Sequence, residues 1–293
     1  MHSYLRAIGF SEYNSKVNIE KLLNYSSKAP DSQHELIGFG EDRVAEVKKE
    51  FGDGFGLTFN GTCIDEEYID IDYYYPYVYS KAVPIKTKIN VEKRVFNNSF
   101  SAVFEDMRIG VSVIFYLQNA IDYMDIMANN EENPETVFKV YLSALSTSGT
   151  ILLPINMTEK DYKRRAIQNS NRSKLIEMAR MGDEAAIEKL TLEDMDTYSK
   201  LSTRIRTEDI FTIVDSCFMP YGLECDLYTI IADILNVREC VNSKTKETVF
   251  ILTLNYNGIL IETAINKKDL TGEPLAGRRF KGVIWLQGRV EKA

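Results

Sequence analysis

The chain has 293 residues, of which 44% are hydrophobic and 27% are charged, and its formal net charge is −8. This composition is typical of a globular protein with one large domain or two smaller ones, and it excludes an intrinsically disordered chain. The negative charge argues against a nucleic-acid or anionic-membrane surface that covers the whole molecule, although one local basic patch is compatible with it.

No apolar run approaches the roughly 18 residues that a membrane-spanning helix needs, and the first residues lack the basic and then apolar pattern of a signal peptide. We therefore expect a cytoplasmic protein that does not associate with a membrane. The four cysteines contain no C-x-x-C pair, so we expect buried thiols rather than disulfides or zinc ligands. No cofactor is expected.

Two helices are predicted in the first 50 residues, because "NIEKLLNYSSK" and "EDRVAEVKKEF" carry apolar residues at near-helical spacing. The glycine-rich stretch "GDGFG", residues 52–56, is predicted to end the second helix. It does not match a phosphate-binding loop, because such a loop follows a strand and opens a helix.

From residue 55 to residue 156 the apolar residues alternate or run over strand lengths, which predicts an antiparallel sheet. A helix is predicted at 119–127, and "STSG" at residues 146–149 is predicted as a hairpin turn. The tyrosine-rich run "YYYPYVY", residues 73–79, is the candidate apolar patch if the chain is a homo-oligomer.

The sequence again predicts helices for residues 157–214, and Gly182 separates two helical runs. Residues 158–180 hold seven basic and three acidic side chains, a balance of +4, whereas residues 181–200 hold two basic and six acidic ones, a balance of −4. Asp183 is predicted to cap the second helix. We expect the two halves to pair with each other, and the alternatives are phosphate contacts for the basic run and a bound cation for the acidic one.

The C-terminal residues return to β structure. A long strand at 227–240 precedes a hairpin with Asn257-Gly258 at its turn, and "GRRFKGVIWLQGRV", residues 277–290, forms the last strand. This order is compatible with a small barrel of OB type and equally with an antiparallel meander.

The fold class is therefore predicted as α+β. It divides into an N-terminal α+β region at 1–156, a helical connector at 157–214 and a C-terminal β domain at 215–293. Packing of all three as one body is compatible with the sequence.

Few catalytic constellations can be assembled from this sequence, and no catalytic residue is assigned. His2 and His34 are the only histidines, and no G-x-S-x-G motif is present, so a serine or cysteine hydrolase is disfavoured. Strand alternation places Asp70 and Asp72 on one face, with their Cα atoms about 7 Å apart. That spacing suits a shared divalent metal ion, whereas a solvated acidic face over an isoleucine core is the simpler interpretation.

The last strand divides by alternation into an apolar face and a face on which Lys281, Gln287 and Arg289 flank Trp285. Single-stranded nucleic acids bind to such faces, because an aromatic ring stacks on a base while cations contact the backbone. The alternative is that the helices of 157–214 cover Trp285, and that the side chains of Lys281 and Arg289 extend to the solvent at the edge of the covered face. We expect Trp285 to be mostly covered.

These observations favour a non-enzymatic cytosolic binding or interaction protein, with Trp285, Lys281, Gln287 and Arg289 as the candidate ligand-binding face. A protein partner or a second copy of the chain is favoured over a nucleic acid as the partner. One alternative is a carboxylate-based enzyme, with or without a divalent metal, that uses Asp70 and Asp72 or the acids of 183–196. Another is single-stranded nucleic-acid binding through the C-terminal β domain.

Four stretches together carry a resemblance to a known family: "MHSYLRAIGFS" at the N-terminus, "GVSVIFYLQN" at 110–119, "GDEAAIEKLTLEDMDTYS" at 182–199 and "INKKDLTGEPLAGRRFKGVIWLQG" at 265–288. The chain resembles, from end to end, a family of bacterial cytosolic proteins of similar length from anaerobic Gram-positive bacteria, which is catalogued as a domain of unknown function. The resemblance implies a bacterial cytoplasmic source. It implies no activity, cofactor or catalytic residue.

Overall fold

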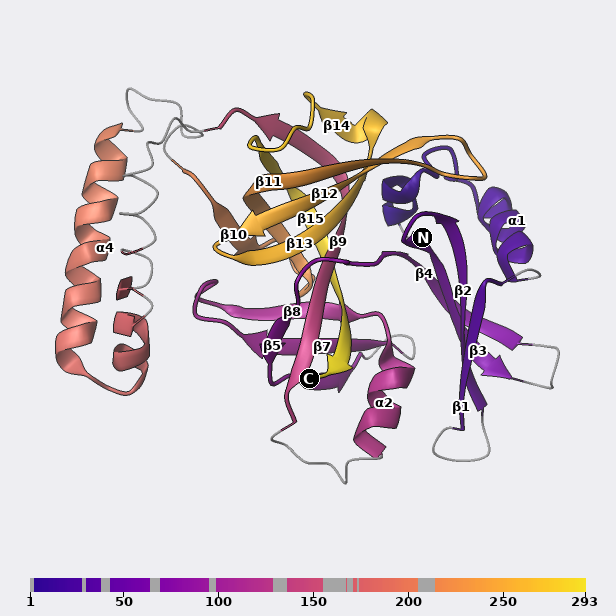
Figure 1. The fold of residues 1–293 in the computed structure, drawn as a ribbon, viewed down its shortest axis with the longest axis horizontal. Helices are drawn as coiled ribbons and strands as arrows, with labels where there is room; N and C mark the ends of the chain where they lie inside the picture. The colour runs from indigo at the N-terminus through magenta and orange to yellow at the C-terminus, as the bar shows by residue number, and fades with distance from the viewer. Residues whose placement is uncertain are drawn as a thin grey trace.

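The computed structural model describes residues 3–27, 30–37, 43–63, 69–94, 99–128, 136–154, 167, 171–172, 174–204 and 214–293. These residues form two β-sheets, with helices at the edges of the molecule (Figure 1). The predicted α+β class with antiparallel sheets is confirmed.

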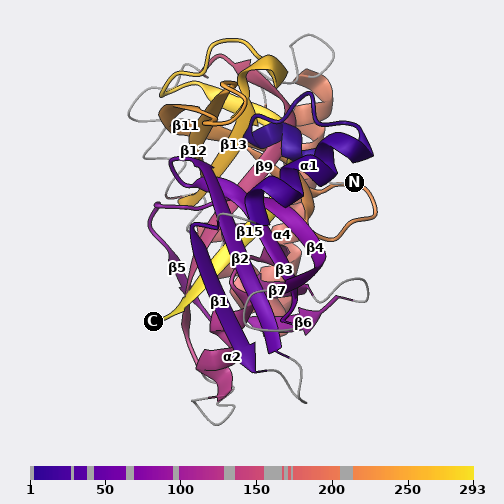
Figure 2. The same cartoon turned by 90° about the vertical axis from the view of Figure 1, so that its right-hand side faces the viewer.

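The smaller sheet contains four antiparallel strands in the order β1-β2-β3-β4. These are β1 (Ser32–Ile37), β2 (Arg43–Gly52), β3 (Phe55–Cys63) and β4 (Ile69–Val78). The 3-10 helix η1 (Ser3–Ile8) and helix α1 (Lys16–Ser27) precede it and lie above it in Figure 2. The Phe10 ring packs edge-on against the Phe51 ring of β2, with centroids 4.9 Å apart, so the N-terminal segment shares this sheet's core.

The second helix predicted in the first 50 residues is wrong, because that stretch forms β2. Alternation buries Ala45 and Val47 on one face, and the neighbouring Glu46 and Lys48 are buried on the other face as an ion pair. The predicted helix stop is therefore a hairpin turn, in which Gly54 has a φ of 82°. Charged residues are ordinarily exposed, which is why this stretch resembles a surface helix in the sequence.

The larger sheet of the described residues contains eleven strands. They are β5 (Ile85–Thr87), β6 (Asn90–Lys93), β7 (Phe100–Glu105), β8 (Ser112–Leu117), β9 (Phe138–Leu152), β10 (Cys217–Pro220), β11 (Leu227–Val241), β12 (Thr248–Tyr256), β13 (Ile259–Asn266), β14 (Leu270–Thr271) and β15 (Arg279–Lys292). The short 3-10 helix η2 (Lys267–Asp269) separates β13 from β14.

Five of these strands pair in a closed ring, in the order β11-β12-β13-β9-β15 and back to β11. β13 and β9 are parallel and the other pairs are antiparallel. Because β9 comes from the predicted N-terminal region, the C-terminal strands do not close this ring by themselves. An OB-type barrel and the three-part domain division stay predictions.

The hairpin turn predicted at 146–149 is wrong, because these residues lie inside the continuous strand β9. Gly149 of β9 pairs with Gly282 of β15, and the Phe280 ring packs beside both glycines. A Cβ atom on Gly149 would lie 2.3 Å from Cε2 of that ring. The glycine therefore makes room for an aromatic ring instead of reversing the chain.

Two local predictions are confirmed. Helix α2 (Ala120–Ala128) forms where a helix was predicted at 119–127. Asn257 and Gly258 have φ angles of 50° and 84° and connect β12 to β13, as a tight hairpin turn requires.

Between β9 and β10 the described residues include two consecutive helical segments, which together we call the helical arm. It consists of helical residues 174–180 and of α4 (Glu184–Arg204), which stands at the left edge of Figure 1, on the side opposite α1. The predicted cap is confirmed, because the Asp183 carboxylate accepts the backbone N–H groups of Ala185 and Ala186. Arg172 lies 2.7 Å from the Asp194 carboxylate, so basic and acidic halves pair at this position as expected.

Candidate functional site

Trp285 lies inside the molecule, on the face of the larger sheet that the smaller sheet covers. Its side chain is 5% exposed, and its ring centroid lies 5.2 Å from that of Tyr4 and 5.3 Å from that of Tyr116. The expected burial is confirmed. The described rings that cover it belong to η1 (Tyr4) and β8 (Tyr116) and not to the helices of 157–214, part of which lies outside the described residues.

The Trp285 indole also forms a hydrogen bond with the buried carboxylate of Asp226. Its Nε1 donates to Oδ2 of Asp226 at 2.9 Å, and Nη1 of Arg94 donates to the same oxygen at 2.7 Å. Asp226 is fully buried, and its Oδ1 has no hydrogen-bond partner among the described residues. A buried carboxylate is tolerated when a cation and hydrogen bonds compensate it, so Trp285 and Arg94 act together on Asp226.

Gln287 is also buried, and it joins the two sheets. Its Nε2 donates to the carbonyl of Pro76 at 2.9 Å, and its Oε1 accepts from Nε2 of Gln118 at 2.9 Å. Gln118 also donates to the carbonyl of Val78 at 3.0 Å. Because β4 is an edge strand, its outward carbonyls need partners from outside the smaller sheet, and the two glutamines supply them.

The two cations of the predicted face lie toward the ends of β15 and are half-buried. The Arg289 guanidinium forms an ion pair with Glu291 and lies 4.5 Å from the Tyr141 ring centroid. Lys281 pairs with Thr150 and Ile231 in the sheet. Since Trp285 and Gln287 between the cations are buried, the structure does not bring the four predicted residues together on an open surface, and their role in ligand binding stays a prediction.

The emission of Trp285 tests this face directly, because the chain has one tryptophan. We expect neither acrylamide nor single-stranded DNA or RNA at low salt to change the emission of the folded chain, because the covered ring cannot stack on a base. The urea-unfolded chain is the control for acrylamide quenching. An emission change on adding an oligonucleotide would support the nucleic-acid hypothesis instead.

A register shift lies beside the two carboxylates proposed for a metal. Asp70 pairs with Thr62, and the shift on β3 falls at Asn60, so Asp72 lies in the irregular part of β4. Asp72 is exposed, while the side chain of Asp70 lies outside the described residues. The described part of the chain contains no group of three His, Cys, Asp or Glu side chains that could hold a metal ion. The metal assignment stays a prediction.

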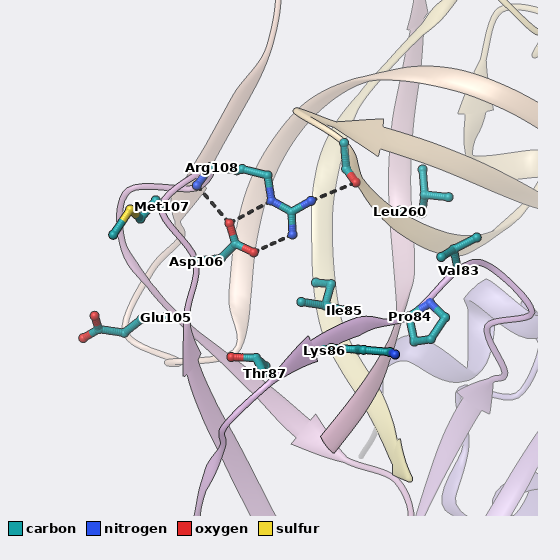
Figure 3. Close-up of a pocket in the computed structure, with 11 residues that line it drawn as sticks. Val83, Pro84, Ile85, Lys86, Thr87, Glu105, Asp106, Met107, Arg108 and Leu260 are labelled. Atoms are coloured by element: carbon teal, nitrogen blue, oxygen red, sulfur yellow. Dashed lines mark hydrogen bonds and ion pairs between the residues drawn. The ribbon is translucent and has the colours of Figure 1, made fainter. Parts of the chain in front are cut away.

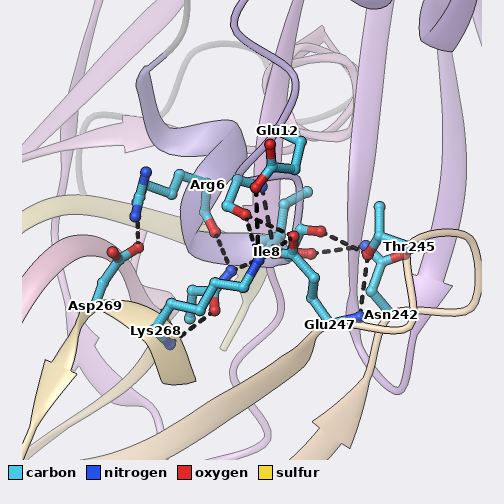
Figure 4. A network of polar contacts seen from close by, with 11 residues as sticks. Arg6, Ile8, Glu12, Asn242, Thr245, Glu247, Lys268 and Asp269 are labelled. Carbon is cyan, nitrogen blue, oxygen red and sulfur yellow. Dashed lines mark hydrogen bonds and ion pairs between the residues drawn. The ribbon is translucent and has the colours of Figure 1, made fainter.

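A polar network attaches the N-terminal segment to the larger sheet (Figure 4). The Glu247 carboxylate accepts from Oγ of Ser11 and Nδ2 of Asn266, both at 2.6 Å, and from Nζ of Lys268 at 3.0 Å. Burial alone would raise the pKa of Glu247, but these hydrogen bonds outweigh it and hold the pKa below its ordinary value. Ser11 follows η1, whereas Asn266 and Lys268 lie together where β13 meets η2, so the shared carboxylate stabilises the packing of the chain's N-terminal end against the larger sheet.

Replacing Glu247 with Gln should lower stability at neutral pH and flatten the acid dependence. A carboxyl group with a depressed folded pKa stabilises the fold above its unfolded pKa, and this contribution is lost as the pH falls through the folded pKa. We expect the wild-type free energy of unfolding to fall between about pH 5 and pH 3. The variant should lose about 2 kcal/mol at pH 7 and show a shallower decrease. Urea unfolding at several pH values measures both, with Glu20→Gln on exposed α1 as the control, and equal acid slopes would contradict the prediction.

A groove of about 490 Å³ lies where the β12–β13 hairpin meets the β7–β8 turn and the segment that leads into β5 (Figure 3). In its wall Arg108 donates to both carboxylate oxygens of Asp106 and, at 3.2 Å, to the carbonyl of Gly258. Ile85 and Leu260 add apolar surface. Because the guanidinium is already neutralised within the wall, the groove does not by itself define a ligand.

The helical arm exposes large apolar side chains at helical spacing. Ile187, Met195 and Tyr198 are 47%, 66% and 74% exposed, and with the exposed Thr191 they follow one another at intervals of four, four and three residues. This spacing places all four on one face of α4, which we call the outer strip. Acidic Glu188 and Asp194 lie on either side of it, and Glu184 lies one turn before Ile187.

The outer strip could not be distinguished from a buried face in the sequence, since apolar residues at helical spacing ordinarily indicate the core side of a helix. The sequence signal that could have identified the strip is that α4 has two apolar faces at helical spacing. Ala186 is buried and Leu190 half-buried on one side, while the outer strip occupies another.

A family model described as "Domain of unknown function, E. rectale Gene description (DUF3881)" matches residues 5–288. No curated protein and no solved structure matches the chain. Within the described residues, every helix is too short or too polar to cross a membrane.

Proposed function

The chain belongs to the DUF3881 family, a domain of unknown function, and from its geometry we propose that it is a non-enzymatic cytosolic interaction protein. In this proposal the two β-sheets form the scaffold and the helical arm is the contact element. The observation that supports it is the exposed outer strip of α4.

An exposed apolar strip favours association because burial of each large apolar side chain contributes about 1.5–3 kcal/mol. Exposed apolar residues that cluster on one surface mark contact sites more often than single exposed ones do. Helical segments that bind partners present their anchors at intervals of three and four residues, which is the spacing from Ile187 to Tyr198.

The contacts that join the two sheets of the scaffold differ from the contact between the arm and the scaffold. The two sheets are joined by buried hydrogen bonds through Gln118 and Gln287. By contrast, Arg180 of the arm forms an ion pair at 2.9 Å with Glu105, and both side chains are largely exposed. An exposed ion pair contributes little to stability, so a partner's contact energy can orient the arm.

Site-specific photo-crosslinking tests the proposal. A benzophenone amino acid in place of Tyr198 should form a discrete adduct in cells that express the chain. The same group in place of Tyr221, which is 49% exposed on the scaffold, is the matched control and should not form that adduct.

The adduct at position 198 should also disappear when Ile187 is replaced with Gln, since both residues belong to the outer strip. Equal adducts from positions 198 and 221, or an adduct that is unaffected by Ile187→Gln, would show that the arm is not the contact element.

A further inference from the structure

Resting on the proposed function, we propose that the partner of the outer strip is an amphipathic helix of another protein, with an apolar face and basic residues along one rim. This helix lies alongside α4 over about three turns. Its apolar side chains cover Ile187, Met195 and Tyr198, and its basic residues meet Glu184 and Glu188.

The first argument is the length and direction of the outer strip. Ile187 and Tyr198 are eleven positions apart, and their strip follows intervals of four, four and three residues. Three turns of an α-helix take about 10.8 residues, so the strip runs nearly parallel to the axis of α4 over about 16 Å. A straight apolar strip of this length suits a second helix laid along it, which presents its own anchors at the same intervals.

The second argument is the charge around the strip. Among the α4 side chains that the structure describes, five are acidic and Lys189 is the one basic residue. At about 100° per residue, Lys189 points about 160° away from the middle of the strip. Glu184 and Glu188 border the strip, are exposed, and have no ion-pair partner within the described residues. A partner with acidic residues at this rim would be repelled, whereas a basic one is attracted.

The third argument is that the two rims of the strip differ. On one rim the Asp194 carboxylate lies 2.7 Å from Nη2 of Arg172, so its charge is already compensated within the arm. On the other rim Glu188 has no such compensation in the described part of the chain, and Glu184 lies one turn before Ile187. The basic residues of the partner should therefore gather at the end of its helix that meets the first two turns of α4.

The apolar and charged contacts have separable effects on binding. Large apolar anchors at the centre of a contact dominate its affinity. Charges at an exposed rim govern the choice of partner and the dependence on salt. The strip and its acidic rim can therefore be tested with different substitutions in the full chain.

Fluorescence anisotropy with two fluorescein-labelled peptides tests the proposal on the purified full chain. Each peptide is an amphipathic helix of about four turns with leucine along one face. The rim residues near one end are lysine in the first peptide and glutamate in the second. We expect the lysine peptide to bind at micromolar concentration and the glutamate peptide to bind about 100-fold more weakly.

Two double variants separate the contributions to binding. Ile187→Gln/Tyr198→Gln should raise the dissociation constant of the lysine peptide about 100-fold, because it removes two apolar anchors. Glu184→Gln/Glu188→Gln should raise the constant about tenfold and flatten its dependence on salt, because it removes the uncompensated charges of the rim.

Glu20→Gln/Glu273→Gln is the matched control for the charge variant. It makes the same change in net charge at two exposed positions outside the arm, and it should bind the lysine peptide as the wild type does. Unchanged Trp285 emission in every variant verifies that the scaffold remains folded.

Failure of the lysine peptide to bind, equal binding of the two peptides, or binding that survives Ile187→Gln/Tyr198→Gln would overturn the proposal. So would a dimer of the chain in sedimentation velocity that this variant dissociates, because a second copy would then cover the strip. These results are distinguishable from failure of the proposed function. If the lysine peptide does not bind but the group at position 198 still forms its adduct, the arm is a contact element for a partner of different chemistry.

Discussion

Replacing Trp285 with Ala should destabilise the fold by about 4 kcal/mol. The indole lies between Tyr4 and Tyr116, so its removal leaves a cavity between the N-terminal segment and the larger sheet. The substitution also removes one of the two donors to the buried carboxylate of Asp226. Urea unfolding followed by circular dichroism measures the loss, since the variant has no tryptophan.

Trp285→Phe separates the two causes. It keeps an aromatic ring in the space but lacks the indole N–H, so we expect a smaller loss of about 2 kcal/mol, because the Asp226 oxygen keeps Arg94 as its one remaining donor. Val283→Ala, at a half-buried position two residues earlier on β15, is the control for substitution in this strand. If Trp285→Ala unfolds at nearly the wild-type urea concentration, the residue is not part of the core as the structure places it.

Replacing Glu46 with Gln should cost about 3–5 kcal/mol, because it leaves the buried ammonium of Lys48 without its carboxylate. Nζ of Lys48 lies 2.5 Å from Oε1 of Glu46, and both side chains are almost fully buried. The double variant Glu46→Leu/Lys48→Met removes both charges and keeps most of the volume. We expect it to be much closer to the wild type in stability, since a buried ion pair can often be replaced by apolar side chains.

The pH dependence of the Glu46→Gln variant should differ in sign from that of the wild type. Burial alone would lower the pKa of Lys48, but Glu46 and Tyr79 outweigh it and raise the pKa above its ordinary value. The wild-type contribution is therefore fully present below the unfolded pKa near 10.4 and is lost only as the pH rises through the folded value.

Without Glu46, burial should dominate and depress the pKa of Lys48, so the folded state favours the neutral amine. The free energy of unfolding of the variant should then rise between about pH 8 and pH 10, where the wild-type value is nearly constant. Parallel curves for the two chains over this range would contradict a buried Lys48.

Several features could be predicted because short-range chemistry decides them. Asn257-Gly258 turns the chain since both positions need positive φ, and Asp183 caps α4 because its carboxylate reaches N–H groups two and three residues away. Alternation along β15 also assigns its two faces, with Phe280 and Leu286 in one core cluster and Trp285 in the other.

The failures involve residues whose partners are distant in the chain. The stretch that forms β2 has charges that suit a surface helix, and only packing between the sheets makes Glu46 and Lys48 a buried pair. "STSG" has turn residues, but Gly149 is required for Phe280, which lies 131 positions later. The tyrosine-rich run at 73–79, considered above as an exposed patch, is instead largely inside, with Tyr75 and Tyr77 buried.

In the candidate site, too, some features follow from the local sequence and others from the tertiary structure. The sequence by itself determined which residues share a face: Trp285 with Gln287 on β15, and Ile187 with Met195 and Tyr198 on α4, because strand and helix periods are properties of the local backbone. The tertiary structure decided which of these faces is open. The smaller sheet and η1 cover the first, and nothing in the described residues covers the outer strip to a comparable extent. Exposure depends on where segments remote in the chain come to lie, and a periodic pattern of apolar residues carries no information about that placement.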